Sequence, residues 1–289
     1  MSATVSTPAP ARAGGPTTGP TGPAAPGTPV PAPRPRRTDL RRPSFARLVT
    51  VEARKTFDTR AGLWLCVSIV VLALLATAAV VLFAPEETLT SEQFASAIGV
   101  PMAIVLPVLA ILSITSEWSQ RSGLTTFTMV PSRGRVIAAK AVVSLVVGVV
   151  SMVVALGVGA LGTIVGSAIA GIDAVWNVSA SEFSSIIIAN LLGMAVGFML
   201  GVVLRSSPAA IVGYFVFSFV VPTLSMTLAA FQDWWVDLQP WLDFSYAQTA
   251  LFEGWPSGEE WAHLGVASLP WLVLPLALGL WTIRRSEVK

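Results

Sequence analysis

The sequence has little charge and few of the residues that enzyme sites use most. Of its 289 residues, 12% are charged and 54% are hydrophobic, whereas about a quarter of an average soluble protein is charged. This shortage and the long apolar runs exclude a soluble globular enzyme. The single cysteine, Cys66, excludes an internal disulfide, and the single histidine, His263, excludes multi-histidine metal sites. We therefore expect neither a metal site nor catalytic residues in this chain.

The sequence also lacks a phosphate-binding loop and charge within its apolar runs. A Walker A motif needs Gly-Lys followed by Ser or Thr, and none of the three lysines follows a glycine. Ion-coupled transporters usually place an ionisable group inside the membrane, but the most polar residue deep inside a run is Asn190. We interpret Asn190 as a helix–helix hydrogen bond rather than a site. If this chain moves a molecule uphill, another subunit must supply the energy.

Residues 1–43 predict a disordered tail. They hold eleven of the 21 prolines and no apolar run, so they cannot bury enough surface to offset their chain entropy. The tail ends in a basic cluster, which predicts a topology signal and attraction to anionic membrane lipid. We expect no nucleic-acid partner. The cluster consists of Arg34, Arg36, Arg37, Arg41 and Arg42.

Residues 44–289 predict an all-α polytopic membrane domain. A helix of about 20 apolar residues crosses a bilayer, and six segments qualify: 62–84, 98–116, 141–168, 183–204, 209–230 and 264–283. All 18 Lys and Arg lie before the first span, in the second and fourth loops, or after the last span. The other three loops carry eleven acids and no cation. The positive-inside rule therefore predicts that both termini are cytoplasmic.

Residues 44–60 predict an amphipathic helix at the inner membrane surface that leads into the first span. Ser44 is suited to cap its N-terminus. A mechanical role and an ordinary basic juxtamembrane helix both remain open. The apolar side chains that define its predicted face are Phe45, Leu48, Val49, Ala53 and Phe57.

The loop at residues 117–140 offers a short apolar patch framed by charge. An acid and a base four residues apart open it, because Glu117 precedes Arg121 in the favourable order. The patch consists of Leu124, Phe127, Met129 and Val130, and Pro131 ends it. Basic residues then lead into the third span, namely Arg133, Arg135 and Lys140. Docking of a partner and burial in lipid head groups both fit this pattern.

Two further patterns concern packing and the outer surface. Gly193, Gly197 and Gly201 recur every four residues, which predicts close helix packing within the bundle rather than a dimer seam. Residues 231–263 hold five tryptophans among six acids, and tryptophan favours the membrane interface. This segment predicts two short interfacial helices, broken near Pro240 and Pro256, that anchor the chain or cap an exit path.

Together these parts resemble the ABC type-2 exporter permeases, the transmembrane subunits of ATP-binding cassette transporters. The resemblance covers about residues 44–289 and is most specific at residues 117–140. There an acid ends the second span, a Gly-Thr stretch and a proline follow, and a lysine opens the third span. These positions are Glu117, Gly123, Thr125, Thr126, Pro131, Arg133 and Lys140. In this sequence Leu124 follows Gly123, and Gly123 lies farther from the acid than is usual. The composition of the tail is actinobacterial-like.

The resemblance implies a subunit of the bacterial cytoplasmic membrane that works with two kinds of partner. One is a second permease subunit, identical or different, and the other is a separate cassette ATPase that binds ATP and Mg. The loop at residues 117–140 would couple ATPase closure to the spans. Spans two and five would form the seam along which a hydrophobic or amphipathic substrate is exported. The predicted pathway residues are Pro101, Met102, Pro107, Phe215, Phe219, Pro222 and Met226.

Two other functions remain open. The chain could be a non-transporting membrane scaffold coupled to an ATPase, although such scaffolds usually carry a large outer domain. It could also be a membrane enzyme of the outer leaflet. In that case its outer carboxylates would act, namely Asp233, Asp237, Asp243 or Glu253.

Overall fold

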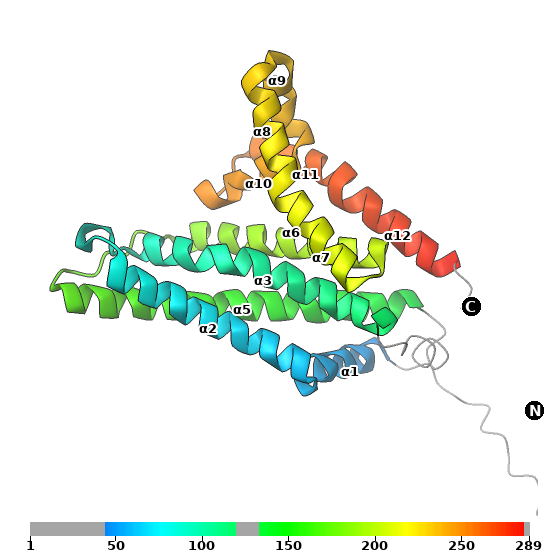
Figure 1. Cartoon of the computed structure of the whole chain (residues 1–289), viewed down its shortest axis with the longest axis horizontal. Helices are drawn as coiled ribbons and strands as arrows, with labels where there is room; N and C mark the ends of the chain where they lie inside the picture. Colours follow the sequence, from blue (N-terminus) through cyan, green and yellow to red (C-terminus); the bar gives the residue numbers. More distant parts are fainter. Residues whose placement is uncertain (1–43, 120–132, 286–289) are drawn as a thin grey trace, which may run out of the picture. The chain divides into compact units, whose positions relative to one another are not determined.

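The computed structural model describes residues 44–119 and 133–285, which belong to one unit beginning at Arg42 (Figure 1). The predicted tail, residues 1–43, lies outside this part of the chain. The first elements are α1 (Phe45–Asp58), α2 (Arg60–Phe83), η1 (Glu86–Thr88), α3 (Ser91–Ser119), α5 (Arg133–Ala170) and α6 (Ala180–Leu204). They are followed by α7 (Ser207–Phe215), η2 (Val216–Val220), α8 (Val221–Phe231), α9 (Asp233–Leu242) and α10 (Phe244–Glu253). The last three are α11 (Gly258–Ser268), η3 (Leu269–Val273) and α12 (Leu274–Arg285).

The six predicted spans are confirmed as helices long and apolar enough to cross a membrane. Their bounds are Gly62–Phe83, Ser91–Ser116, Gly134–Ala170, Ala180–Leu204, Ser207–Phe231 and Gly258–Ile283. The described residues form no strand, and the only bridge of that kind joins Thr90 to Val175 in two outer loops. The chain is therefore an all-α polytopic membrane protein.

The core lies where α3 packs between α2, α5 and α6 (Figure 1). Helices α3 and α6 make the most extensive contact because the glycine stripe of α6 faces α3. A Cβ on Gly197 would lie 2.7 Å from the carbonyl oxygen of Pro107, and one on Gly201 would lie 2.3 Å from Ile114. The stripe thus packs within the bundle, as predicted.

A second apolar cluster joins α6 and α7 to the helices α10 and α11. The predicted break near Pro256 is confirmed, but the one near Pro240 is wrong, because Pro240 lies inside α9. The chain breaks instead at Asp243, whose backbone is extended. The Asp243 carboxylate accepts hydrogen bonds from the backbone N–H groups of Ser245 and Tyr246, at 2.9 and 3.2 Å. This cap starts α10, so the outer segment holds two helices, α9 and α10, before α11 opens the sixth span.

The last two spans each contain one π-helical turn followed by a proline. The backbone N–H of Val221 donates to Val216, and that of Leu274 donates to Leu269. Pro222 and Pro275 come directly after these turns and lack an N–H for the usual helical bond. The two turns also touch, because the rings of Phe217 and Trp271 lie 5.5 Å apart. Such turns often occur at functional sites.

Candidate functional site

Helix α1 forms at the predicted place and packs against the bundle. Ser44 caps it, since its hydroxyl accepts a hydrogen bond from the Arg47 N–H at 3.3 Å. Val49 and Ala53 pack against the core, whereas Phe45 and Phe57 are 39% and 52% exposed. The reason is geometric: each step of four residues rotates a helix position by about 40°, so the ends of the series diverge. Leu48 is half-buried.

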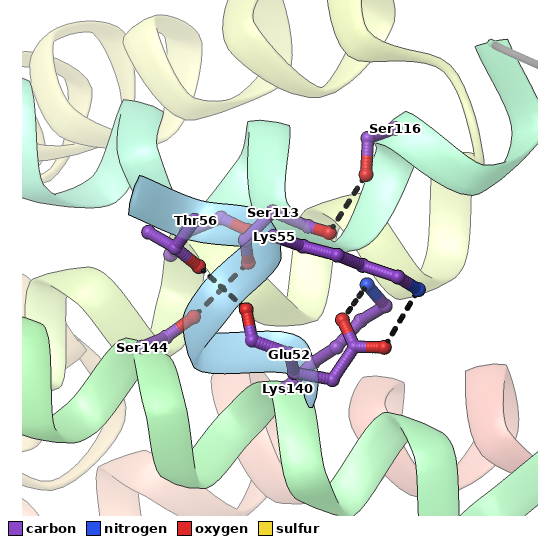
Figure 2. A network of polar contacts seen from close by, with 8 residues as sticks. Glu52, Lys55, Thr56, Ser113, Ser116, Lys140 and Ser144 are labelled. Carbon is purple, nitrogen blue, oxygen red and sulfur yellow. Dashed lines mark hydrogen bonds and ion pairs between the residues drawn. The ribbon is translucent and has the colours of Figure 1, made fainter. Parts of the chain in front are cut away.

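The most buried residue of α1 is Glu52, which is only 5% exposed. Its carboxylate contacts Lys140 of α5 at 2.5 Å and Lys55 of α1 at 2.9 Å (Figure 2). Lys140 is equally buried, whereas Lys55 is 45% exposed at its side chain. The ion pair therefore joins α1 to α5 across 88 residues of sequence.

The surroundings of Glu52 hold it in its charged form. Burial raises the pKa of its carboxyl, but the charges and hydrogen bonds of Lys140 and Lys55 outweigh burial and lower the pKa below its ordinary value. Because breaking a buried pair leaves a buried charge without its counter-charge, it typically costs about 3–5 kcal/mol. The arrangement specifies how α1 is seated on α5.

Hydroxyl groups extend this junction to α3. The hydroxyls of Ser113 in α3 and Ser144 in α5 lie 3.0 Å apart, and Ser116 donates to the backbone carbonyl of Ser113 at 3.1 Å. Thr56 donates to the backbone carbonyl of Glu52 at 3.1 Å. Figure 2 shows these groups gathered around the ion pair where α1, α3 and α5 meet. We call the side chains of Glu52, Lys55, Thr56, Ser113, Ser116, Lys140 and Ser144 the junction cluster.

The predicted coupling loop is described only at its ends. Glu117 lies in the last turns of α3, and Arg133 opens α5. Arg135 is half-buried and Lys140 is buried two turns into α5. The other predicted contact residues lie outside the described part of the chain, namely Arg121, Leu124, Phe127, Met129 and Pro131. The loop thus ends in a helix that the junction cluster ties to α1.

Sequence reasoning predicted Lys140 but missed Glu52. The signal was present, because Glu52 follows Val49 by three residues and precedes Ala53 and Thr56 on one helix face. An acid on an apolar helix face needs a counter-charge when it is buried. The periodicity could not reveal which cation supplies it, since several lysines and arginines lie on the same side of the predicted membrane.

The predicted pathway residues do not share one surface. Phe219 and Met226 are exposed, and Phe219 stacks on Phe215 with the ring centres 6.0 Å apart. Met102, by contrast, is fully buried within the core. The placement of Met102 on an exposed seam is therefore wrong, because α6 and its neighbours cover that face of α3. The prolines differ in the same way, since Pro107 is buried while Pro101 and Pro222 are half-buried.

Asn190 is predicted to bond a neighbouring helix, and Asp243 is a candidate catalytic carboxylate. Among the described residues Asn190 makes no helix–helix hydrogen bond: its amide N–H donates to Ile186 in its own helix at 2.9 Å, and its Oδ1 finds no partner. Among the outer carboxylates, Asp243 is buried and acts as the cap of α10. Over residues 44–119 and 133–285, no group of three or more His, Cys, Asp or Glu side chains could hold a metal ion.

A comparison of the sequence with models of known protein families finds no match, and a comparison with curated proteins finds none either.

Proposed function

We propose that this chain is the transmembrane permease subunit of an ABC type-2 transporter of the bacterial cytoplasmic membrane. It exports a hydrophobic or amphipathic substrate, both termini are cytoplasmic, and a separate subunit binds and hydrolyses ATP with Mg. The resemblance at residues 117–140 and the six apolar helices support this proposal. The observation that carries it is the buried contact between Glu52 and Lys140, because it links the end of the proposed coupling loop to α1.

The junction cluster gives the proposal a physical mechanism. A partner ATPase that pushes on the loop displaces the first turns of α5. Since Lys140 contacts Glu52, α1 moves with α5 unless a buried ion pair breaks. Helix α1 leads directly into α2, and α5 packs against α3. The push is thereby distributed over three spans, α2, α3 and α5, instead of one. A second permease subunit completes the pathway.

The proposal is tested by purification of the native complex. The chain carries a C-terminal tag, is extracted in mild detergent, and is analysed for stoichiometric partners. We expect a soluble ATPase at one copy per permease chain and vanadate-sensitive ATP hydrolysis by the complex. Purification of the chain alone in several detergents, with no ATPase bound or stimulated, would overturn the proposal.

The loop itself is tested by charge insertion. Phe127→Asp and Met129→Asp place a carboxylate in the apolar patch, and we expect them to lower the amount of ATPase recovered per chain. The matched control is Val236→Asp, because Val236 is an exposed apolar residue on α9, outside the proposed coupling loop. Equal recovery of the ATPase with all three variants would show that the loop is not the docking element.

The outer-leaflet enzyme is the alternative that the same purification can favour. Asp243 is occupied as a helix cap, which counts against a catalytic role for it. Substrate turnover by the purified chain without an ATPase would support this alternative, and the same turnover in Asp237→Asn would remove Asp237 from the candidates.

A further inference from the structure

A polar cavity of about 180 Å³ lies between α3, α6, the π turn η2 and α10. This volume is large enough for several water molecules or for a polar group of similar size. Its polar lining comes from Asn190, Tyr214, Ser218, Ser245 and Gln248. None of the residues that line it carries a charge. The cavity is thus suited to a neutral polar group rather than to an ion.

Two side chains of the cavity wall donate hydrogen bonds to the backbone of neighbouring helices. Tyr214 donates to the backbone carbonyl of Ala103 at 2.7 Å and also has Ser218 as a side-chain partner. Gln248 donates to the backbone carbonyl of Ala189 at 2.7 Å. These bonds fix the walls of the cavity and attach α10 and α7 to their neighbours.

One acceptor is left over. Asn190 is only 3% exposed, and its Oδ1 has no hydrogen-bond partner among the residues that the structure describes. Buried polar atoms are nearly always satisfied, because an unmet acceptor inside a protein costs free energy. The cavity therefore has room beside an acceptor that a donor from a bound molecule could satisfy.

The position of the cavity indicates by which route a ligand that carries a hydrogen-bond donor reaches Asn190. Asn190 lies ten residues, or about 15 Å, from the start of α6, near the middle of that span. Phe252 also lines the cavity and is 50% exposed, so the cavity reaches the surface of the chain. A ligand that enters there crosses apolar surroundings, which requires an apolar chain attached to its polar group.

We propose that this cavity binds the neutral, hydroxyl-bearing head group of an amphipathic molecule, with a hydroxyl donating to Asn190 Oδ1. The aromatic rings of Phe217 and Phe252 flank the polar group, and its chain extends into the surroundings. This binding needs neither an ATPase nor transport, so it stands or fails independently of the proposed function.

The experiment compares two probes with the same chain. Glycerol monooleate carries a glycerol head group with two free hydroxyls, whereas methyl oleate has no donor. Binding to the purified full chain in detergent is measured by native mass spectrometry over a titration of each probe. We expect glycerol monooleate to bind about tenfold more tightly than methyl oleate. The reason is that one of its hydroxyls donates a hydrogen bond to a buried acceptor that otherwise stays unsatisfied. Equal affinities would overturn the proposal.

Variants assign the preference to this cavity. Asn190→Leu removes the acceptor while keeping the branched outline of the side chain, and we expect it to abolish the tenfold preference. Gly193→Val fills the cavity from another position, where an added Cβ meets only ordinary contacts to Tyr214, Pro107 and Gln248, and should have the same effect. Ser225→Ala is the control, because Ser225 is buried in α8 outside the cavity. A preference that survives in both cavity variants would place the binding elsewhere on the chain and overturn the proposal.

Discussion

At the scale of single residues, the carboxylate of Glu52 is the most consequential group in α1. It is the buried charge of a helix whose other charged residues are exposed, and its two oxygens contact two lysines of different exposure. Buried ion pairs are often no more stable than apolar replacements, but they are costly to break from one side. The pair therefore specifies geometry more than it adds stability.

Glu52→Gln tests this view by removing one charge while keeping the shape of the side chain. Because the buried contact between Lys140 and Glu52 loses one of its two charges, we expect the free energy of unfolding to fall by about 3–5 kcal/mol. Chemical unfolding in detergent micelles measures the change. Lys55→Met is the control, with an expected loss of only about 0–1 kcal/mol, because Lys55 is partly exposed. Equal losses in the two variants would contradict the assignment.

The same carboxyl makes stability depend on pH. Its pKa is lowered in the folded chain from the ordinary 4.5, so its contribution is complete above that value and is lost as the pH falls through the lowered pKa. We expect the melting temperature of the wild type to fall more steeply as the pH drops below 4.5 than that of Glu52→Leu/Lys140→Met. Parallel curves for the two proteins would show that the pair does not titrate in this way.

At the scale of elements, α3 and α6 pack closely because the glycines of α6 have no side chain at the contact. Gly197→Ala would place a Cβ 2.7 Å from the backbone carbonyl of Pro107, which cannot rotate away. We expect a loss of about 1–3 kcal/mol in unfolding free energy through overpacking. Gly157→Ala in α5 is the matched control, since nothing lies within 4 Å of its added Cβ, and we expect it to be neutral or slightly stabilising. A loss of the same size in both variants would contradict the packing argument, because Ala favours the helix over Gly at both positions.

The elements could be predicted from the sequence wherever local patterns decide them. A run of about 20 apolar residues makes a span wherever it occurs, and Ser44 caps α1 as its side chain predicts. The error at Pro240 has a local cause as well, because the cap at Asp243 decides where the chain turns. The partner of Lys140 and the burial of Met102 were out of reach, since both depend on residues far away in sequence.

The polar cavity illustrates the same limit. Asn190 stands out in the sequence as the one strongly polar residue in its span, so its location was known. Which of its atoms finds a partner depends on the approach of α10, whose Gln248 takes the neighbouring carbonyl of Ala189. The sequence of α6 alone does not show that α10 packs against it at this point.

At the scale of the whole molecule, the orientation of the chain is open to direct measurement. Cysteines are introduced one at a time into a Cys66→Ala background, at Asp237 in α9 or at Ser286 after the last span. We expect a membrane-impermeant thiol reagent to label Asp237→Cys on intact cells but Ser286→Cys only after permeabilisation, as the positive-inside rule predicts. The reverse pattern would invert the proposed topology and remove the coupling loop from the cytoplasm.

The length of α5 sets a condition on the surrounding bilayer. The helix has 38 residues, and its part beyond Lys140, residues 141–170, is about 45 Å long at 1.5 Å per residue. A hydrocarbon layer is about 30 Å thick, and a longer apolar helix adjusts by tilting or by thickening the lipid around it. Membrane thickness thereby becomes a mechanical input to this chain. A thicker bilayer lets α5 stand more upright, and the ion pair at its end carries that change of angle to α1.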